Sequence, residues 1–174
     1  MCKKLLLNDE NLSISISDTT RRSRANEING KDYNFISEEL FKERINSGKY
    51  LEYASVFGHY YGSLKSEIDK NFQLGKDVIF DIDWQGAKQI KNSTYKNILS
   101  FFIMPPSKNI IFERLKLRAT ESGDDEESIK TRMTNYERDI SYQREYDHVL
   151  INDELDTCVE QISKLIYLRR KINI

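Results

Sequence analysis

Short apolar stretches alternate with amphipathic ones along the whole chain. Polar and apolar residues alternate over 12–17, which predicts a strand, and an apolar run over 77–83 that ends in two acids predicts a buried strand. The runs 98–104 and 148–151 predict two further strands. Apolar periodicity predicts helices over 3–7, 86–90, 107–118, 126–142 and 153–171. Strands that alternate with helices indicate the α/β class, so we expect a parallel central sheet flanked by helices on both faces.

The stretch 17–62 interrupts this rhythm with short, polar and aromatic strands. A hairpin is expected over 50–61, turning at Gly58-His59. A chain of 174 residues is long enough for one domain with a real core and too short for two ordinary ones. We therefore expect a single domain over 1–174, in which the interrupting stretch forms an inserted mixed β/α lobe over 17–75.

Turn and cap residues divide this lobe. A short strand is expected over 33–36, ahead of a helix that has Ser37 as its N-cap and Gly48 at its end. Ser63 is the expected N-cap of a second helix, which runs to Gly75.

Composition and charge exclude several classes of partner. The net charge is -1, so no overall basic field attracts nucleic acid or an anionic membrane. No apolar run approaches the ~20 residues needed to cross a bilayer. Cys2 and Cys158 are far apart in sequence and lack metal-ligand spacing, which favours free thiols in a reducing compartment. We expect a cytoplasmic protein with no nucleic-acid and no membrane partner.

The segment 17–35, SDTTRRSRANEINGKDYNF, gathers cationic side chains on one short loop. Guanidinium groups bind phosphate through paired planar N–H donors, and tyrosine hydroxyls add further donors. Arg21 and Arg24, with Tyr33 and Tyr61, are therefore candidates for a phosphate clamp. An exposed basic loop beside two half-buried tyrosines is an equally good interpretation of the composition.

Carboxylates supply a second set of candidates. Glu52, in an aromatic strand, and Ser63 could together bind a purine edge that carries N–H donors and a carbonyl, although a lone strand Glu more often faces solvent. Asp81 and Asp83 end the predicted strand 77–83, at the sheet edge where α/β proteins bind ligands. Alternate strand residues share a face, so both carboxylates are expected to point the same way, toward Mg²⁺ or a substrate amino group. Two buried acids without partners would be costly, which favours a functional role.

Three further arginines lie in the second half of the chain. Arg114 and Arg118 are four residues apart on one predicted helix face, and Arg132 lies beyond the acidic loop 121–127. A helical flap carrying them could close over phosphates and neutralise the charge that moves during transfer. A helix surface laced with ion pairs is the simpler interpretation of so charged a segment.

In this order the pieces resemble the guanylate kinase family, the nucleoside monophosphate kinases that phosphorylate GMP with ATP. Four blocks carry the resemblance: SDTTRRSRANEINGKDYNF, GHYYGS over 58–63, IFDIDWQG over 79–86 and VLINDEL over 149–155. The resemblance covers essentially the whole chain. It implies a P-loop kinase-like fold whose first strand is missing here, a GMP-binding lobe over 17–75 and a helical lid over 109–139.

The resemblance also implies a role for each matching residue. Arg21, Arg24, Tyr33 and Tyr61 would hold the GMP phosphate. The residues that would recognise guanine are Ser17, Glu52, Ser63 and Asp83. Asp81 would help to place Mg²⁺, and Asn152 would lie beside the adenine of ATP. The residues that would act on the ATP phosphates and the transferred phosphoryl group are Arg114, Arg118 and Arg132, with Arg21 on the acceptor side.

The implied reaction is in-line transfer from Mg²⁺-bound ATP to GMP, and to dGMP, in purine nucleotide metabolism, by a monomer or homodimer. The sequence departs from the family in one respect, since it contains no G-x-x-x-x-G-K-[ST] phosphate loop ahead of the first helix. Either the chain is a truncated form of an active enzyme, which its opening in mid-helix favours, or it is a protein that keeps only the GMP half. We expect these 174 residues to bind GMP but to transfer phosphate poorly.

A different class of function stays open. Guanylate kinase-like modules of scaffold proteins have lost catalysis and grip phosphorylated peptides with the same lobe. Asp81, Asp83 and the three lid arginines argue against this alternative, because a scaffold has no use for them.

Overall fold

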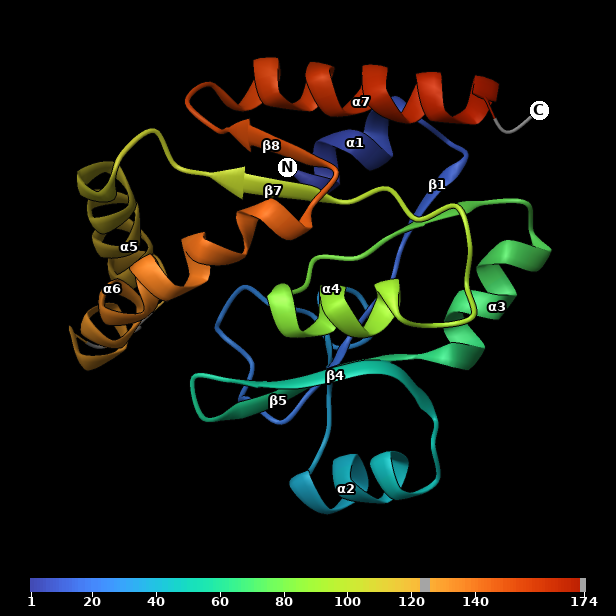
Figure 1. Cartoon of the computed structure of the whole chain (residues 1–174). Helices are drawn as coiled ribbons and strands as arrows, with labels where there is room; N and C mark the ends of the chain where they lie inside the picture. The colour runs from blue at the N-terminus through green and yellow to red at the C-terminus, as the bar shows by residue number, and fades with distance from the viewer. Residues whose placement is uncertain (123–125, 173–174) are drawn as a thin grey trace. The chain divides into compact units, whose positions relative to one another are not determined.

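The computed structural model describes residues 1–122 and 126–172 (Figure 1). The chain divides into two compact units, residues 2–95 and residues 96–174, with Met1 counted in the second. Residues 123–125, which belong to the predicted acidic loop 121–127 and to the predicted lid 109–139, lie outside the described residues.

In the first unit a parallel strand pair follows two helices. Helix α1 (Cys2–Asn8) leads into β1 (Leu12–Ile14), and α3 (Lys65–Gln73) leads into β6 (Asp77–Ile79). The two strands run parallel, with Leu12 opposite Asp77 and Ile14 opposite Ile79. Parallel strands joined through helices confirm the predicted α/β class.

Two predicted strands are shorter in the structure. The strand expected over 12–17 ends at Ile14, because the chain then leaves β6 and residues Asp18–Thr19 form β2 in another sheet. The strand expected over 77–83 ends at Ile79, and helix α4 (Trp84–Lys91) begins five residues later. The expectation that two carboxylates share one strand face over 77–83 is therefore wrong.

The interrupting stretch forms a four-stranded mixed sheet in the order β3-β2-β5-β4. Strand β2 runs parallel to β3 (Asn34–Phe35) and antiparallel to β5 (His59–Leu64), which pairs in turn with β4 (Tyr50–Val56). Helix α2 (Glu38–Asn46) packs on this sheet through Phe41, whose ring stacks on Tyr50 at 4.6 Å and on Tyr60 at 5.3 Å. A Cβ on Gly62 would lie only 3.1 Å from the Phe41 ring, so a larger residue here would have to displace that ring by a few tenths of an ångström.

The lobe's turn and cap predictions have mixed outcomes. Ser37 is the N-cap of α2, accepting from the Leu40 N–H at 3.2 Å, and Gly48 follows the helix at φ 63°. The hairpin turns at Phe57-Gly58, both with positive φ, and not at Gly58-His59. Ser63 does not cap a helix, since β5 continues to Leu64 and the Ser63 hydroxyl bonds elsewhere.

The second unit holds another parallel pair. Strand β7 (Phe101–Met104) lies beside β8 (His148–Ile151), with Phe101 opposite His148. Helices α5 (Lys108–Ser122) and α6 (Glu126–Ser141) pack on each other and are linked by a 3.0 Å ion pair between Lys108 and Glu137. A 3₁₀ turn (Tyr142–Glu145) precedes β8, and α7 (Leu155–Ile172) ends the unit (Figure 1). None of the helices within the described residues has the length and apolar character that crossing a membrane requires.

Candidate functional site

Strands β4 and β5 bring a buried acid and two hydroxyls together. Glu52 lies opposite Ser63 in the strand pairing, and the Ser63 hydroxyl donates to Glu52 Oε1 at 2.6 Å. Ser17 Oγ, just before β2, is 3.5 Å from Ser63 Oγ. Glu52 is 2 % exposed and Ser63 fully buried, so the solvent-facing interpretation of Glu52 is wrong.

The environment of Glu52 opposes its ionisation. Burial raises the pKa of the Glu52 carboxyl to about 7, the hydrogen bond from Ser63 opposes that shift, and the nearby charge of Asp83 adds to it. A carboxyl with a pKa near 7 is partly protonated at neutral pH. Its ionised form can accept hydrogen bonds with both oxygens, and N–H donors of a ligand would favour that form. Such a group suits the recognition of a polar, N–H-bearing edge.

Asp83 reaches this region from the start of α4. It is the N-cap of that helix, accepting from the backbone N–H of Gln85 at 3.0 Å and of Gly86 at 3.1 Å. A Cβ on Gly86 would lie 2.4 Å from Glu52 Oε2, so the Glu52 carboxylate rests directly against the first turn of α4. Gly86 is thus a site residue that no residue-level argument from the sequence identified, although it ends the block IFDIDWQG.

Arg21, Tyr33 and Tyr61 form an aromatic and cationic cluster beside β2 and β5. Arg21 Nε donates to the Tyr61 hydroxyl at 3.3 Å, and its guanidinium carbon lies 5.3 Å from the centre of the Tyr33 ring. The rings of Tyr33 and Tyr61 meet edge to face at 5.9 Å. The Arg21 side chain is only 12 % exposed, so the interpretation as an exposed basic loop is wrong for this arginine, although Arg22 and most of the residues up to Gly30 are exposed.

Glu27, to which no sequence motif assigns a role, joins Arg21 and Arg24. Its carboxylate accepts from both terminal nitrogens of Arg21 at 2.9 Å, and its Oε1 lies 3.5 Å from Arg24 Nη1. Partial burial disfavours the charge on Arg21, but the bonds to Glu27 and Tyr61 outweigh it and raise the pKa of Arg21.

Asp81 lies apart from the buried acids. It is exposed, yet after burial its charge is the largest contribution that raises the pKa of Tyr33, so its carboxylate acts on the phenol of the aromatic cluster. Within residues 1–122 and 126–172, no group of three or more His, Cys, Asp and Glu side chains could hold a metal ion. A single carboxylate nevertheless fits Mg²⁺, which binds through one or two carboxylates together with substrate phosphates and water.

The second unit places two of its four predicted ligands in direct contact. Arg114, on α5, donates to the backbone carbonyls of Asn152 at 2.9 Å and of Asp153 at 3.2 Å. Arg118 also lies on α5 and is exposed, whereas Arg132 is half-buried on α6, the helix that packs against α5. The bonds of Arg114 go to main-chain oxygens, so surface ion pairs do not account for this residue.

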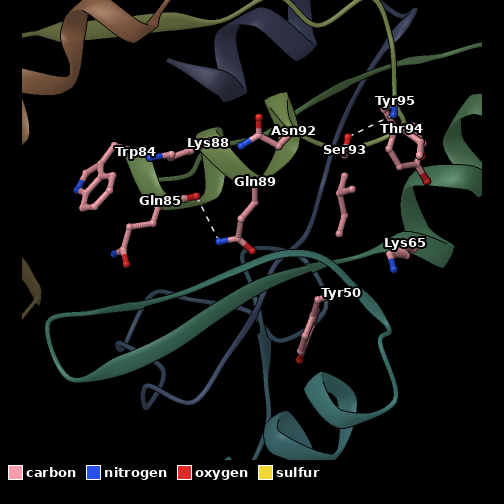
Figure 2. A pocket seen from close by; sticks show the side chains of 11 residues that line it. Tyr50, Lys65, Trp84, Gln85, Lys88, Gln89, Asn92, Ser93, Thr94 and Tyr95 are labelled. Atoms are coloured by element: carbon pink, nitrogen blue, oxygen red, sulfur yellow. Dashed lines mark hydrogen bonds between the residues drawn. The ribbon is translucent and has the colours of Figure 1, made fainter.

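A hollow of about 850 Å³ opens in the first unit between β4 and α4. Figure 2 shows Gln89 extending from α4 toward β4, where it donates to the Tyr53 carbonyl at 2.7 Å and accepts from the Tyr53 N–H at 3.1 Å. These two bonds satisfy backbone groups at the edge of the sheet. None of the predicted ligands lines this hollow, whose side chains come from Tyr50, Leu51, Lys65, Trp84, Gln85, Lys88, Gln89, Asn92, Ser93, Thr94 and Tyr95.

The fold is that of an α/β protein, with paired parallel strands, helices between them, and a mixed sheet that carries an arginine–tyrosine cluster and a buried acid. The guanylate kinase family model matches residues 1–168. The chain belongs to the guanylate kinase family, and it is therefore a nucleotide-binding kinase, a transferase.

Individual relatives agree with this assignment. The chain is 43% identical to the guanylate kinase of Rickettsia prowazekii over 173 residues, which is 99% of this chain and 86% of that protein. It is 43% identical to the guanylate kinase of Ruegeria sp. over 98% of this chain and 77% of that one. The crystal structure of guanylate kinase from Anaplasma phagocytophilum superposes with a TM-score of 0.76 at 33% identity, covering 96% of this chain and 79% of that chain.

Proposed function

We propose that the chain takes GMP as phosphoryl acceptor and ATP as donor. The observation that carries the proposal is the joint burial, in one sheet, of Glu52 and Ser63 a few residues from the Arg21–Tyr61 cluster. A guanine edge offers a ring N–H, an amino group and a carbonyl oxygen. A buried acid beside hydroxyls complements that pattern, and adenine, which lacks it, would leave Glu52 unpaired.

Recognition of the base requires one rearrangement. The Ser63 hydroxyl now donates to Glu52, and it must turn toward the guanine oxygen while Glu52 accepts from the guanine N–H groups. Ser17 Oγ, 3.5 Å from Ser63 Oγ, can follow that rotation as donor or acceptor. Asp83 would accept from the amino group at the edge of the site, while it keeps its bonds to the first turn of α4.

The phosphate of GMP would then meet Arg21, Arg24, Tyr33 and Tyr61. Guanidinium N–H groups and phenolic hydroxyls suit the three phosphate oxygens of a nucleoside monophosphate. On the donor side, Arg114, Arg118 and Arg132 would neutralise ATP phosphates, and Asn152 would lie beside the adenine. The predicted lid 109–139 would bring them there.

Transfer would be in line and without a covalent enzyme intermediate, so positioning and charge neutralisation carry the catalysis. Mg²⁺, held partly by Asp81 and partly by the nucleotide, would supply neutralisation of phosphate charge. Arg21 would orient the attacking phosphate oxygen of GMP, and closure would exclude water. We place this activity in the cytoplasm, with dGMP as a second acceptor.

A polypeptide of these 174 residues lacks the sequence G-x-x-x-x-G-K-[ST], whose backbone amides and lysine hold ATP phosphates in P-loop kinases. We therefore propose that this polypeptide binds GMP well and forms GDP slowly. A coupled assay for GDP decides the second part, and turnover within the ordinary range of ~1–100 s⁻¹ for kinases would contradict it.

Calorimetry with four ligands tests the first part. GMP should bind at least ~100-fold more tightly than AMP, since AMP leaves the buried acid unpaired. Guanosine should bind more weakly than GMP because it lacks the phosphate. A phosphoserine peptide that binds as tightly as GMP, with AMP and GMP indistinguishable, would favour the phosphopeptide module and refute the kinase site.

A further inference from the structure

Glu27 occupies the centre of the arginine segment between β2 and β3. Its two carboxylate oxygens accept from Nη1 and Nη2 of Arg21, both at 2.9 Å, in the parallel fork arrangement that makes such pairs strong. The same carboxylate accepts from the backbone N–H of Arg24 at 2.8 Å and lies 3.5 Å from Arg24 Nη1. One side chain therefore fixes both cationic residues.

The backbone of the segment is folded around this carboxylate. The Glu27 N–H donates to the Arg24 carbonyl at 3.1 Å, which closes a turn over 24–27. Arg21 Nη1 also donates to the Arg22 carbonyl at 2.7 Å. With the bond to Tyr61, four of the five Arg21 N–H groups have acceptors before any ligand arrives, and one N–H of Nη2 is left for a phosphate.

Two effects of this arrangement act on a phosphate in opposite directions. A fixed carboxylate removes the rotamer freedom of two long side chains in advance, so the ligand does not have to order them. It also reduces the local charge, because two guanidinium groups and one carboxylate carry a net charge of +1. The Arg24 backbone N–H donates to the carboxylate itself, so a ligand that displaced the carboxylate would also break that bond.

We propose that Glu27 is a positioning residue, which stays on Arg21 and Arg24 when the ligand binds and holds both guanidinium groups toward one phosphate. The proposal rests on the proposed GMP function of the same cluster. Although partial burial disfavours its charge, the hydrogen bonds from Arg21 and Arg24 keep the pKa of Glu27 below its ordinary value, so it is ionised throughout the neutral range.

The test compares a ligand that carries the phosphate with one that lacks it. Wild type and Glu27→Gln are titrated with GMP and with guanosine, by calorimetry and by NMR chemical shifts respectively. We expect Glu27→Gln to weaken GMP roughly 10- to 100-fold, because two side chains must now be ordered on binding, and to leave guanosine unchanged. Glu27→Asp, which keeps the charge on a shorter stem, should recover part of the loss. Glu43→Gln, at an exposed position of α2, is the matched control and should bind both ligands like wild type.

Each other result overturns the proposal. Tighter GMP binding by Glu27→Gln would mean that the carboxylate competes with phosphate for the arginines. Equal weakening of GMP and guanosine, with a lower melting temperature, would mean that Glu27 serves only the fold of the lobe. Unchanged GMP affinity would remove any role. A wild type that binds neither ligand would instead refute the proposed function, which separates the two failures.

Discussion

Replacing Glu52 by glutamine changes one buried carboxyl into a neutral group of nearly the same shape. The carboxyl is 2 % exposed, and its burial raises its pKa from 4.5 to about 7. A pKa difference of that size means that ionisation costs the folded protein about 3 kcal/mol more than it costs the unfolded chain. Glutamine avoids this cost, because it keeps an acceptor oxygen for the Ser63 hydroxyl and carries no charge.

The sign of the pH dependence follows from which state holds the proton. The unfolded carboxyl loses its proton near pH 4.5 and the folded one near pH 7, so between these values the folded state binds more protons. The stability of the wild type therefore falls as pH rises through this window. Relative to wild type, Glu52→Gln should gain about 1 kcal/mol at pH 5 and about 3 kcal/mol at pH 8.

Urea unfolding of both proteins at pH 5 and pH 8 measures this difference, with Glu43→Gln as an exposed glutamate control. A variant that is less stable than wild type at pH 8, or whose advantage does not grow between the two pH values, would refute the reasoning. In that case the Glu52 carboxylate would be stabilised when ionised, and the burial cost would be absent.

The same substitution should abolish the binding that the acid serves. Ionised Glu52 accepts from two guanine N–H groups, whereas glutamine presents its own N–H donors to one of them, so GMP affinity should fall at least ~100-fold. The ratio of wild-type to variant affinity should rise with pH up to about 7 and then level off, because Glu52 ionises over this range. The titration of the GMP phosphate affects both proteins equally and cancels in the ratio. A flat ratio would contradict a direct contact between Glu52 and the base. A substitution that stabilises the fold and weakens binding is typical of a residue that serves binding at the expense of folding stability.

Two further substitutions test the packing around the site. Gly86→Ala should lower GMP affinity by ~10-fold or more and should lower the melting temperature. The new methyl group would lie 2.4 Å from Glu52 Oε2 and would force that carboxylate to move. Unchanged GMP titrations would mean that Glu52 need not stay where it is. Arg44→Met should destabilise the protein by about 3 kcal/mol or more in urea, because it removes one partner of a buried ion pair: Asp18 is fully buried and bonded to Arg44 and to the Tyr50 hydroxyl. Adding Asp18→Asn to Arg44→Met should recover much of that loss, and a purely additive double variant would show that the two charges are not coupled.

Local signals in the sequence were sufficient for much of the fold. The strand over 148–151 and the Ser37 N-cap were confirmed, because a short apolar run and a side-chain cap depend on neighbouring residues only. The α/β class followed from the alternation of such segments. The blocks that carry the family resemblance also named Arg21, Tyr33 and Tyr61, which the structure brings together.

What the sequence could not determine depended on contacts between distant residues. The pairing of β4 with β5 decided that Ser63 bonds to Glu52 and does not cap a helix. The point at which the chain leaves β6 decided that Asp83 caps α4 and does not end a strand. The residues over 12–17 kept a strand pattern to the end, yet only residues 12–14 pair in a sheet, and the next strand, in another sheet, begins at Asp18. Alternation specifies which residues can share a face, but not which partner strand supplies the hydrogen bonds. Only the folded chain sets that choice, because it depends on every other element that competes for the same backbone groups.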